Sequence, residues 1–275
     1  MLDNEGFLWL GTAEGLNRFD GYQNQPVLGP NNEFNDAPTN YLFQDSKRNL
    51  WVSYSINGVH QYDLKRNTTK LVINLKIKHG NQLTQEAHHI SEDKQGNILF
   101  SMDEGVYSYS YVTDKLSAEY LLPDEMINNG TYVRAHLLSN DILFIGTRDG
   151  LYGVERGKNT PFLISHLPSN TISTADRINV KMLSTDDNSK LWVGTVEGLF
   201  SLPLSQVKDF ILGIHSAPEA IVRIKNRNIW AFASLNSDMF YAATDKGLYS
   251  YQKKVKCYNT YFCTLTVGTS WPVMY

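Results

Sequence analysis

The sequence is poor in cysteine and in long apolar runs, and each shortage excludes a class of protein. Its two cysteines, Cys257 and Cys263, are too few for a disulfide framework or a four-thiolate metal site. No stretch approaches the roughly 20 apolar residues that span a bilayer, and the first residues lack the basic and apolar regions of a signal peptide. We therefore expect a soluble chain without an export signal of its own.

Charge is also scarce. Only 19% of the residues are charged, and 25 Lys and Arg against 28 Asp and Glu give a net charge of -3. This balance lacks the positive field that dominates binding to nucleic acids, so we expect no nucleic-acid partner. Aromatic residues are plentiful instead, with 16 Tyr, 12 Phe and 5 Trp, and such residues favour half-buried β-strands.

An internal repeat organises the chain. The segment LWLGTAEGL at residues 8–16 returns as LWVGTVEGL at residues 191–199, and weaker copies lie between and after these two. A glycine anchors each copy and recurs every 43 to 49 residues. The anchor glycines are Gly15, Gly58, Gly105, Gly150, Gly198 and Gly247.

Each repeat has the features of a β-hairpin around its anchor glycine. An acidic or amide residue usually precedes the glycine, as Glu14 precedes Gly15, and this pairing suits a tight turn with positive φ. A large apolar residue such as Trp9 lies before the turn, and two places later a small one such as Gly11 marks close contact between sheets. Four short strands in about 46 residues fit a propeller blade better than a solenoid coil or a sandwich.

We therefore predict an all-β fold, a β-propeller of four-stranded blades with six repeats in a single domain over residues 1–275. The first repeat begins inside the motif without its innermost strand, so the chain is interpreted as a fragment of a larger propeller protein. The predicted repeats are residues 1–34, 35–83, 84–127, 128–171, 172–217 and 218–259. Residues 260–275 are either a closing strand that pairs beside residues 8–12 or a divergent tail.

Residues that recur in every repeat are interpreted as scaffold, because a site needs one constellation and a scaffold needs many copies. Four aspartates lie six residues before the large apolar residue, each beside a turn whose backbone N–H groups its side chain would cap. They are Asp3, Asp45, Asp93 and Asp186. Gly-Thr pairs such as Gly11-Thr12 end a strand without a following helix, so they form no phosphate loop.

The repeat resembles a known family. The pattern D-x-x-G-x-L-W-L-G-T-x-x-G-L-x-x-F-D, intact at residues 3–20 and nearly so at residues 186–202, is similar to the regulator-propeller repeat of bacterial two-component sensors. The signatures of WD40 repeats and of the sialidase Asp-box are absent. The resemblance implies a periplasmic ligand-sensing propeller in an inner-membrane-anchored receptor, either a hybrid histidine kinase or a diguanylate cyclase.

The loops that lead into the inner strands differ from repeat to repeat and open on one face of the predicted propeller. Amide and guanidinium donors beside aromatic rings suit a polar ligand, so we predict ligand-binding roles for His88, Tyr132, Arg134 and Arg177. The alternative is that Asn and Asp simply populate these turns. His88 and His89 are adjacent and would point to opposite faces of a strand, so we expect no shared metal ion.

The leading hypothesis is a non-enzymatic sensor domain that binds a small polar ligand, such as an oligosaccharide or carboxylate, and relays the signal. Its further partners would be other propeller or signalling domains of the same protein, or a second copy in a homodimer. No catalytic residue, metal or cofactor is predicted. Two alternatives stay open: a propeller lyase or hydrolase acting on polysaccharide, with a non-repeated cluster of His, Glu, Asp or Arg, and a protein-interaction scaffold with an exposed apolar patch.

Overall fold

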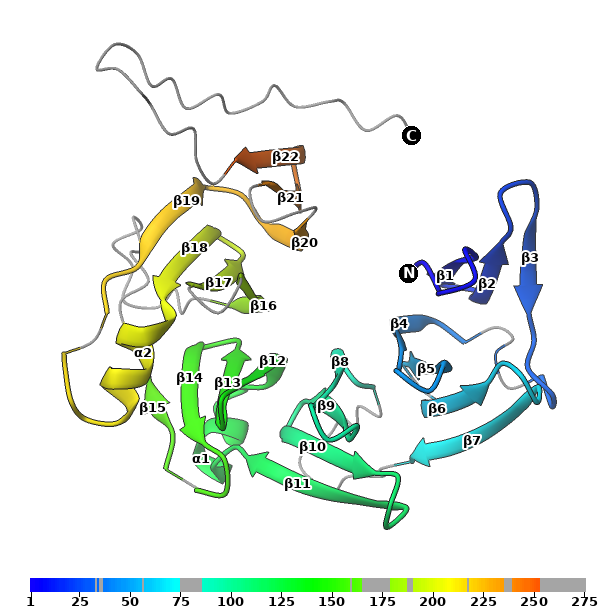
Figure 1. Ribbon diagram of the computed structural model, residues 1–275, viewed down its shortest axis with the longest axis horizontal. Coiled ribbons are helices and arrows are strands. Elements are labelled where there is room, and N and C mark those ends of the chain that lie inside the picture. The colour runs from blue at the N-terminus through cyan, green and yellow to red at the C-terminus, as the bar shows by residue number, and fades with distance from the viewer. Residues whose placement is uncertain are drawn as a thin grey trace. The chain divides into compact units, whose positions relative to one another are not determined.

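A computed structural model describes the chain apart from residues 33, 35–36, 56, 75–85, 159, 165–178, 187–189, 217, 235–238 and 253–275. The chain divides into two compact units, Met1–Arg134 and Ala135–Tyr275. Each unit contributes three antiparallel sheets, whose strands Figure 1 labels, and the six sheets are the blades of a β-propeller. The sequence-based prediction of an all-β propeller is confirmed, whereas that of a single domain over residues 1–275 stays a prediction.

The first unit holds a three-stranded blade and two four-stranded blades, with the strands of each sheet in chain order. Among the described residues the first blade has three strands and no inner one, which agrees with the sequence. The first blade consists of β1 (Leu8–Thr12), β2 (Gly15–Phe19) and β3 (Asn24–Val27). The second consists of β4 (Thr39–Gln44), β5 (Asn49–Tyr54), β6 (Gly58–Asp63) and β7 (Thr68–Ile73). The third consists of β8 (His89–Glu92), β9 (Ile98–Met102), β10 (Gly105–Ser110) and β11 (Lys115–Leu121), followed by the short helix α1 (Asp124–Asn128).

The second unit has two four-stranded blades and, among the described residues, a three-stranded one. The fourth blade consists of β12 (Val133–Ser139), whose first two residues fall in the first unit, β13 (Ile142–Thr147), β14 (Gly150–Glu155) and β15 (Phe162–Leu163). The fifth consists of β16 (Val180–Asp186), β17 (Lys190–Thr195), β18 (Gly198–Pro203) and β19 (Ile221–Lys225). The sixth consists of β20 (Ile229–Ser234), β21 (Met239–Thr244) and β22 (Gly247–Gln252).

The boundary between the fifth and sixth repeats differs from the expected one at residues 217 and 218. Strand β19 pairs with β18 and is the outer strand of the fifth blade. The shift arises because helix α2 (Leu204–Ile211), which the sequence analysis did not predict, is inserted between β18 and β19. The helix starts after Pro203 and buries Leu204, Val207 and Ile211, one apolar side of a short amphipathic helix. The closing strand or tail expected at residues 260–275 lies outside the described residues.

The column of small residues lies where adjacent blades touch, as predicted. A Cβ atom built on Gly11 would lie 2.7 Å from Cγ2 of Thr39, the first residue of β4. A Cβ on Gly146 would likewise lie 2.6 Å from Cγ1 of Val180, the first residue of β16. A larger side chain at either position would push the next blade away, so the small residue sets the spacing of the sheets.

The anchor glycines also leave room for the outer strand of their own blade to approach closely. Gly58 has a φ of +76°, and a Cβ there would lie 2.0 Å from the carbonyl oxygen of Ile73 on β7. The pairing of β6 with β7 shifts register between Val59 and His60, next to this close approach. The glycine is therefore required both by its backbone conformation and by the strand beside it.

We expect Gly58→Ala to lower the free energy of unfolding by about 3 kcal/mol or more, because it combines a positive φ with a backbone clash. Gly6→Ala is the matched control, since Gly6 also has a positive φ, of +89°, but has no atom within 4 Å of the added Cβ. It should cost about 1 kcal/mol from backbone strain alone. Urea unfolding of the two variants measures the difference, and equal losses would contradict the contact with β7.

Candidate functional site

The repeated aspartates are structural, as the sequence analysis proposed. Oδ1 of Asp3 accepts hydrogen bonds from the backbone N–H groups of Glu5 and Phe7, both at 2.9 Å. Its Oδ2 accepts the indole N–H of Trp9 at 2.7 Å. Asp45, Asp93 and Asp186 cap their own turns in the same way. The hydrogen bond to the indole was not predicted. The constant spacing of six residues between the aspartate and the tryptophan could have indicated it.

The Gly-Thr pairs also serve the turns. The hydroxyl of Thr195 donates to the carbonyl oxygen of Gly198 at 3.0 Å and accepts the backbone N–H of Glu197 at 3.0 Å. Thr12 and Thr147 make the equivalent pair of bonds around Gly15 and Gly150. These hydroxyls are therefore occupied by the hairpin, as expected for scaffold residues.

A different group of side chains is not repeated and lies where two inner strands begin. His88 directly precedes β8, Tyr132 directly precedes β12, and Arg134 is the second residue of β12. The turn between β9 and β10 supplies Asp103, whose carbonyl oxygen accepts the backbone N–H of Val133 at 3.0 Å. That bond holds the start of β12 against the hairpin. We call Glu86, His88, Asp103, Tyr132 and Arg134 the polar cluster.

Both ring nitrogens of His88 face a carboxylate. Nε2 lies 2.7 Å from Oδ1 of Asp103, and Nδ1 lies 3.7 Å from Oε1 of Glu86. The His88 side chain is only 12% exposed, whereas that of Asp103 is 40% exposed. The histidine is thus oriented by two acids, and Asp103 keeps contact with solvent. Glu86 also accepts a hydrogen bond from Asn40, which ties the second blade to the cluster.

Tyr132 links the histidine to the arginine. Its ring centroid lies 6.0 Å from that of His88, and its hydroxyl accepts a bond of 3.1 Å from Nη2 of Arg134. The Arg134 guanidinium carbon lies 5.1 Å from the centre of the same ring. Nε of Arg134 is buried and has no hydrogen-bond partner among the residues that the structure describes. A buried N–H donor without an acceptor is costly, which makes this nitrogen a candidate donor to a ligand.

The structure therefore brings together three of the four residues predicted to bind a ligand, namely His88, Tyr132 and Arg134. Arg177 lies outside the described residues. The sequence analysis missed Asp103, which lies in a hairpin turn rather than in a loop leading into an inner strand. Among the described residues, no group of three or more His, Cys, Asp or Glu side chains is arranged to hold a metal ion.

His88 and His89 diverge, as their adjacency on a strand predicted. The His89 ring packs edge-on against Tyr41 of β4, with centroids 5.2 Å apart and planes at 73°. Burial lowers the pKa of His89 from 6.5 to about 4, because the charged imidazolium loses its hydration there. Burial likewise raises the pKa of Tyr41 to about 12. His89 belongs to the contact between blades rather than to the polar cluster.

The lowered pKa of His89 predicts a specific loss of stability in acid. Between pH 6.5 and 4 the unfolded chain binds a proton at His89 that the folded chain does not, so stability is full above this range and falls as the pH drops through it. The loss should be on the order of 2 kcal/mol. Urea unfolding between pH 7 and 4 measures it, and His89→Phe should flatten the decline. Tyr41→Phe keeps the ring contact and should preserve the decline; an unchanged slope in His89→Phe would refute the assignment.

Comparisons with known proteins connect the chain to solved propellers. No protein-family model matches the sequence, and no curated protein matches it. The extracellular domain of BT3049 from B. thetaiotaomicron, described as a hybrid two-component system, is similar with 18% identity and a TM-score of 0.68 over 92% of this chain. The extracellular domain of BT4673 from the same organism, described as a one-component system, gives 20% identity and a TM-score of 0.67 over 92% of the chain.

The chain covers only 33% and 31% of those two proteins, about a third of their length. Propellers with other functions are similar as well. A virginiamycin B lyase from Staphylococcus aureus aligns with 13% identity and a TM-score of 0.60, over 92% of this chain and 79% of the lyase. At these identities the comparisons show the fold, which is that of extracellular domains of two-component sensors and also of an enzyme. Within the described residues, no helix has both the length and the apolar character needed to cross a membrane.

Proposed function

We propose that this segment is the sensor propeller of a receptor, positioned outside the cytoplasmic membrane, and that its polar cluster binds a small ligand carrying a carboxylate. The observation that carries the proposal is the buried Nε of Arg134, which lies beside the ring of Tyr132 and has no hydrogen-bond partner in the described part of the chain. A guanidinium prefers a planar carboxylate as its hydrogen-bond acceptor, since two N–H groups then bind two oxygens at once. The similarity to extracellular domains of two-component systems supports the location.

The remaining residues of the cluster favour a sugar acid over a simple anion. Asp103 is partly exposed and accepts hydrogen bonds, so it suits the hydroxyl groups that a sugar acid carries in addition to its carboxylate. Tyr132 offers an aromatic surface against which a sugar ring packs. An acidic oligosaccharide therefore satisfies the arginine, the aspartate and the tyrosine together. Its binding would act on the hydrogen bond between Asp103 and Val133, the first residue of β12.

A thermal-shift screen of uronic-acid oligosaccharides, neutral oligosaccharides and small carboxylates tests the proposal. Ligands that bind should carry a carboxylate, and at one hundred times Kd they should stabilise the fold by roughly 2.7 kcal/mol. Arg134→Ala should weaken such a ligand by about tenfold to a hundredfold, the value of hydrogen bonds to a charged group.

Arg66→Ala is the matched control, because Arg66 is an 80% exposed side chain whose ion pair with Asp63 lies on the second blade. It should leave affinity unchanged. A carboxylate ligand that binds Arg134→Ala as tightly as the parent protein would refute the assignment of the site.

A lyase acting on acidic polysaccharide is the second candidate, because the polar cluster holds the non-repeated histidine, acid and arginine that such an enzyme needs. The geometry of His88 argues against it: both ring nitrogens face carboxylates, and proton abstraction requires a nitrogen directed at the substrate. We therefore favour binding without turnover.

Incubation with polygalacturonate, with and without Mn²⁺ or Ca²⁺, should accordingly yield no new unsaturated or reducing ends. Absorbance of unsaturated uronides and a reducing-end assay measure both products. Metal-dependent product formation that disappears in His88→Ala, while His215→Ala retains it, would establish the lyase instead. His215 is an exposed histidine on the segment after α2 and serves as the matched control.

A further inference from the structure

Two blade interfaces within the unit Met1–Arg134 are built from the same repeat positions but are closed differently. One lies between the second and third blades, and the other between the first and second. The strand registers define the equivalent residues: Gln61 lies opposite Trp51, as Arg18 lies opposite Trp9. The two interfaces can therefore be compared position by position.

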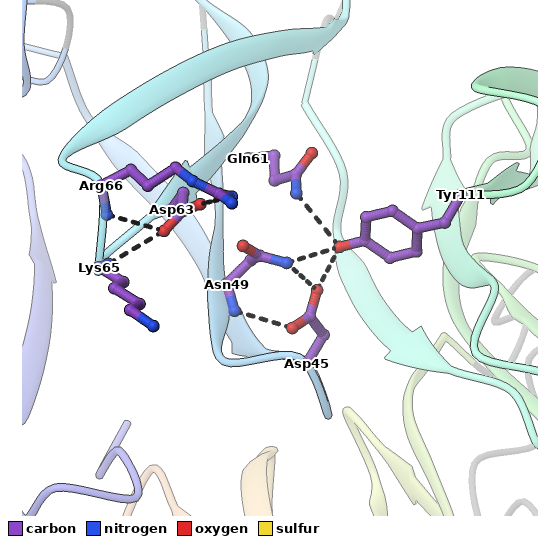
Figure 2. A network of polar contacts seen from close by, with 7 residues as sticks. All are labelled: Asp45, Asn49, Gln61, Asp63, Lys65, Arg66 and Tyr111. Atoms are coloured by element: carbon purple, nitrogen blue, oxygen red, sulfur yellow. Dashed lines mark hydrogen bonds and ion pairs between the residues drawn. The ribbon is translucent and has the colours of Figure 1, made fainter.

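A tyrosine closes the interface between the second and third blades (Figure 2). Tyr111 follows β10, and its hydroxyl donates to Oδ2 of the buried Asp45. The same hydroxyl accepts hydrogen bonds from Nδ2 of Asn49 at 3.0 Å and Nε2 of Gln61 at 3.3 Å. Its ring lies edge-on to Trp51, with centroids 6.1 Å apart. A phenol thus fills this position and satisfies the scaffold aspartate.

At the interface between the first and second blades, the position equivalent to Tyr111 carries no phenol; Tyr62 also lines this interface, but its hydroxyl donates to Asn67. Leu64 follows β6 at the position that corresponds to Tyr111, six residues after the anchor glycine. A cavity of about 330 Å³ lies there, lined by Asp3, Trp9, Arg18 and Leu64 among others. This volume lies within the range of small-molecule sites. The cavity therefore lies beside the same aspartate and tryptophan that Tyr111 contacts in the neighbouring interface.

The polar groups around the cavity match those that hold the Tyr111 hydroxyl. Among the described residues, Oδ2 of Asp3 accepts only the Trp9 indole, whereas Oδ2 of Asp45 accepts the Trp51 indole, the amide of Asn49 and the phenol of Tyr111. Burial alone would raise the pKa of Asp3, but the bonds from Trp9 and from backbone N–H groups lower it overall, so the carboxylate is ionised at neutral pH. An ionised carboxylate with a spare lone pair accepts a phenol strongly.

Arg18 takes the place of Gln61 as the donor on the opposite side. Its guanidinium carbon lies 4.6 Å from the centre of the Phe7 ring and 6.0 Å from that of Trp9. These two aromatic contacts hold the guanidinium at the cavity wall, where its N–H groups are available to a phenol oxygen. The cavity thus offers an acceptor, a donor and aromatic walls in the arrangement that surrounds Tyr111.

We propose that this cavity is a second binding site, distinct from the polar cluster, and that it takes a phenol. The aryl ring occupies the space that the Tyr111 ring fills in the neighbouring interface, its hydroxyl donates to Asp3, and Arg18 donates to its oxygen. The site shares no residue with the polar cluster. The proposal therefore does not depend on whether the polar cluster binds a sugar acid.

The test uses 4-fluorophenol as probe, observed by ¹⁹F NMR with the whole chain. Fluorobenzene, which lacks the hydroxyl, is the matched probe and should bind at least tenfold more weakly. Leu64→Tyr should abolish binding and raise Tm, because the new side chain supplies the phenol that Tyr111 supplies elsewhere. Leu71→Tyr makes the same substitution at an exposed position on β7 and should leave binding unchanged.

The reverse substitution tests the same idea at the other interface. Tyr111→Leu should lower Tm and create a second site, so that two molecules of 4-fluorophenol bind where one bound before, and the probe should restore part of the lost Tm. Three results would overturn the proposal: no binding to the parent chain, equal affinity for fluorobenzene, or unchanged binding in folded Leu64→Tyr. If Leu64→Tyr fails to fold, an unchanged stoichiometry in Tyr111→Leu overturns it instead.

Discussion

The hydrogen bonds of an aspartate that recurs in four of the six repeats fix the turn before a core strand of the blade. Asp3 and Asp45 each bind the backbone of a turn with one oxygen and the indole of a tryptophan six residues later with the other. A tight turn, the start of a strand and a large core side chain are thereby fixed by one carboxylate. The cost of burying this charge is offset because every bond it makes is charge-assisted. The rest of the blade is built on that fixed corner.

This constraint explains why the fold could be predicted from the sequence. The aspartate lies six residues before a large apolar side chain in four repeats, and an anchor glycine follows in all six, so the repeated positions indicate a repeated local geometry. Helix α2 could not be predicted in the same way, because it occurs in one repeat alone and is only eight residues long. Strand β19 was consequently placed in the following blade, one strand away from its true partner.

The candidate site was predictable to a lesser degree. His88, Tyr132 and Arg134 were selected because the topology of a blade places the starts of the inner strands on one face, and the structure brings them together. The pairing of His88 with Asp103 could not be read from the sequence, because it depends on which of several acids in the hairpin turns points toward the histidine. Side-chain direction in a turn is decided by packing, which leaves no periodic signal.

Function in a repeat fold resides in the departures from the repeat, and the two sites proposed for this chain are departures of different kinds. The polar cluster consists of side chains that are not part of the repeat, at strand starts and turns where the scaffold allows variation. The cavity beside Asp3 instead lies where a side chain is missing. Leu64 occupies the position at which Tyr111 closes the next interface, while groups that would bind a tyrosine hydroxyl are still present. Such a site needs no additional residues, because the carboxylate of Asp3 is already buried and ionised in its structural role. Comparing equivalent interfaces within one chain therefore reveals both the empty position and the chemistry that fits it.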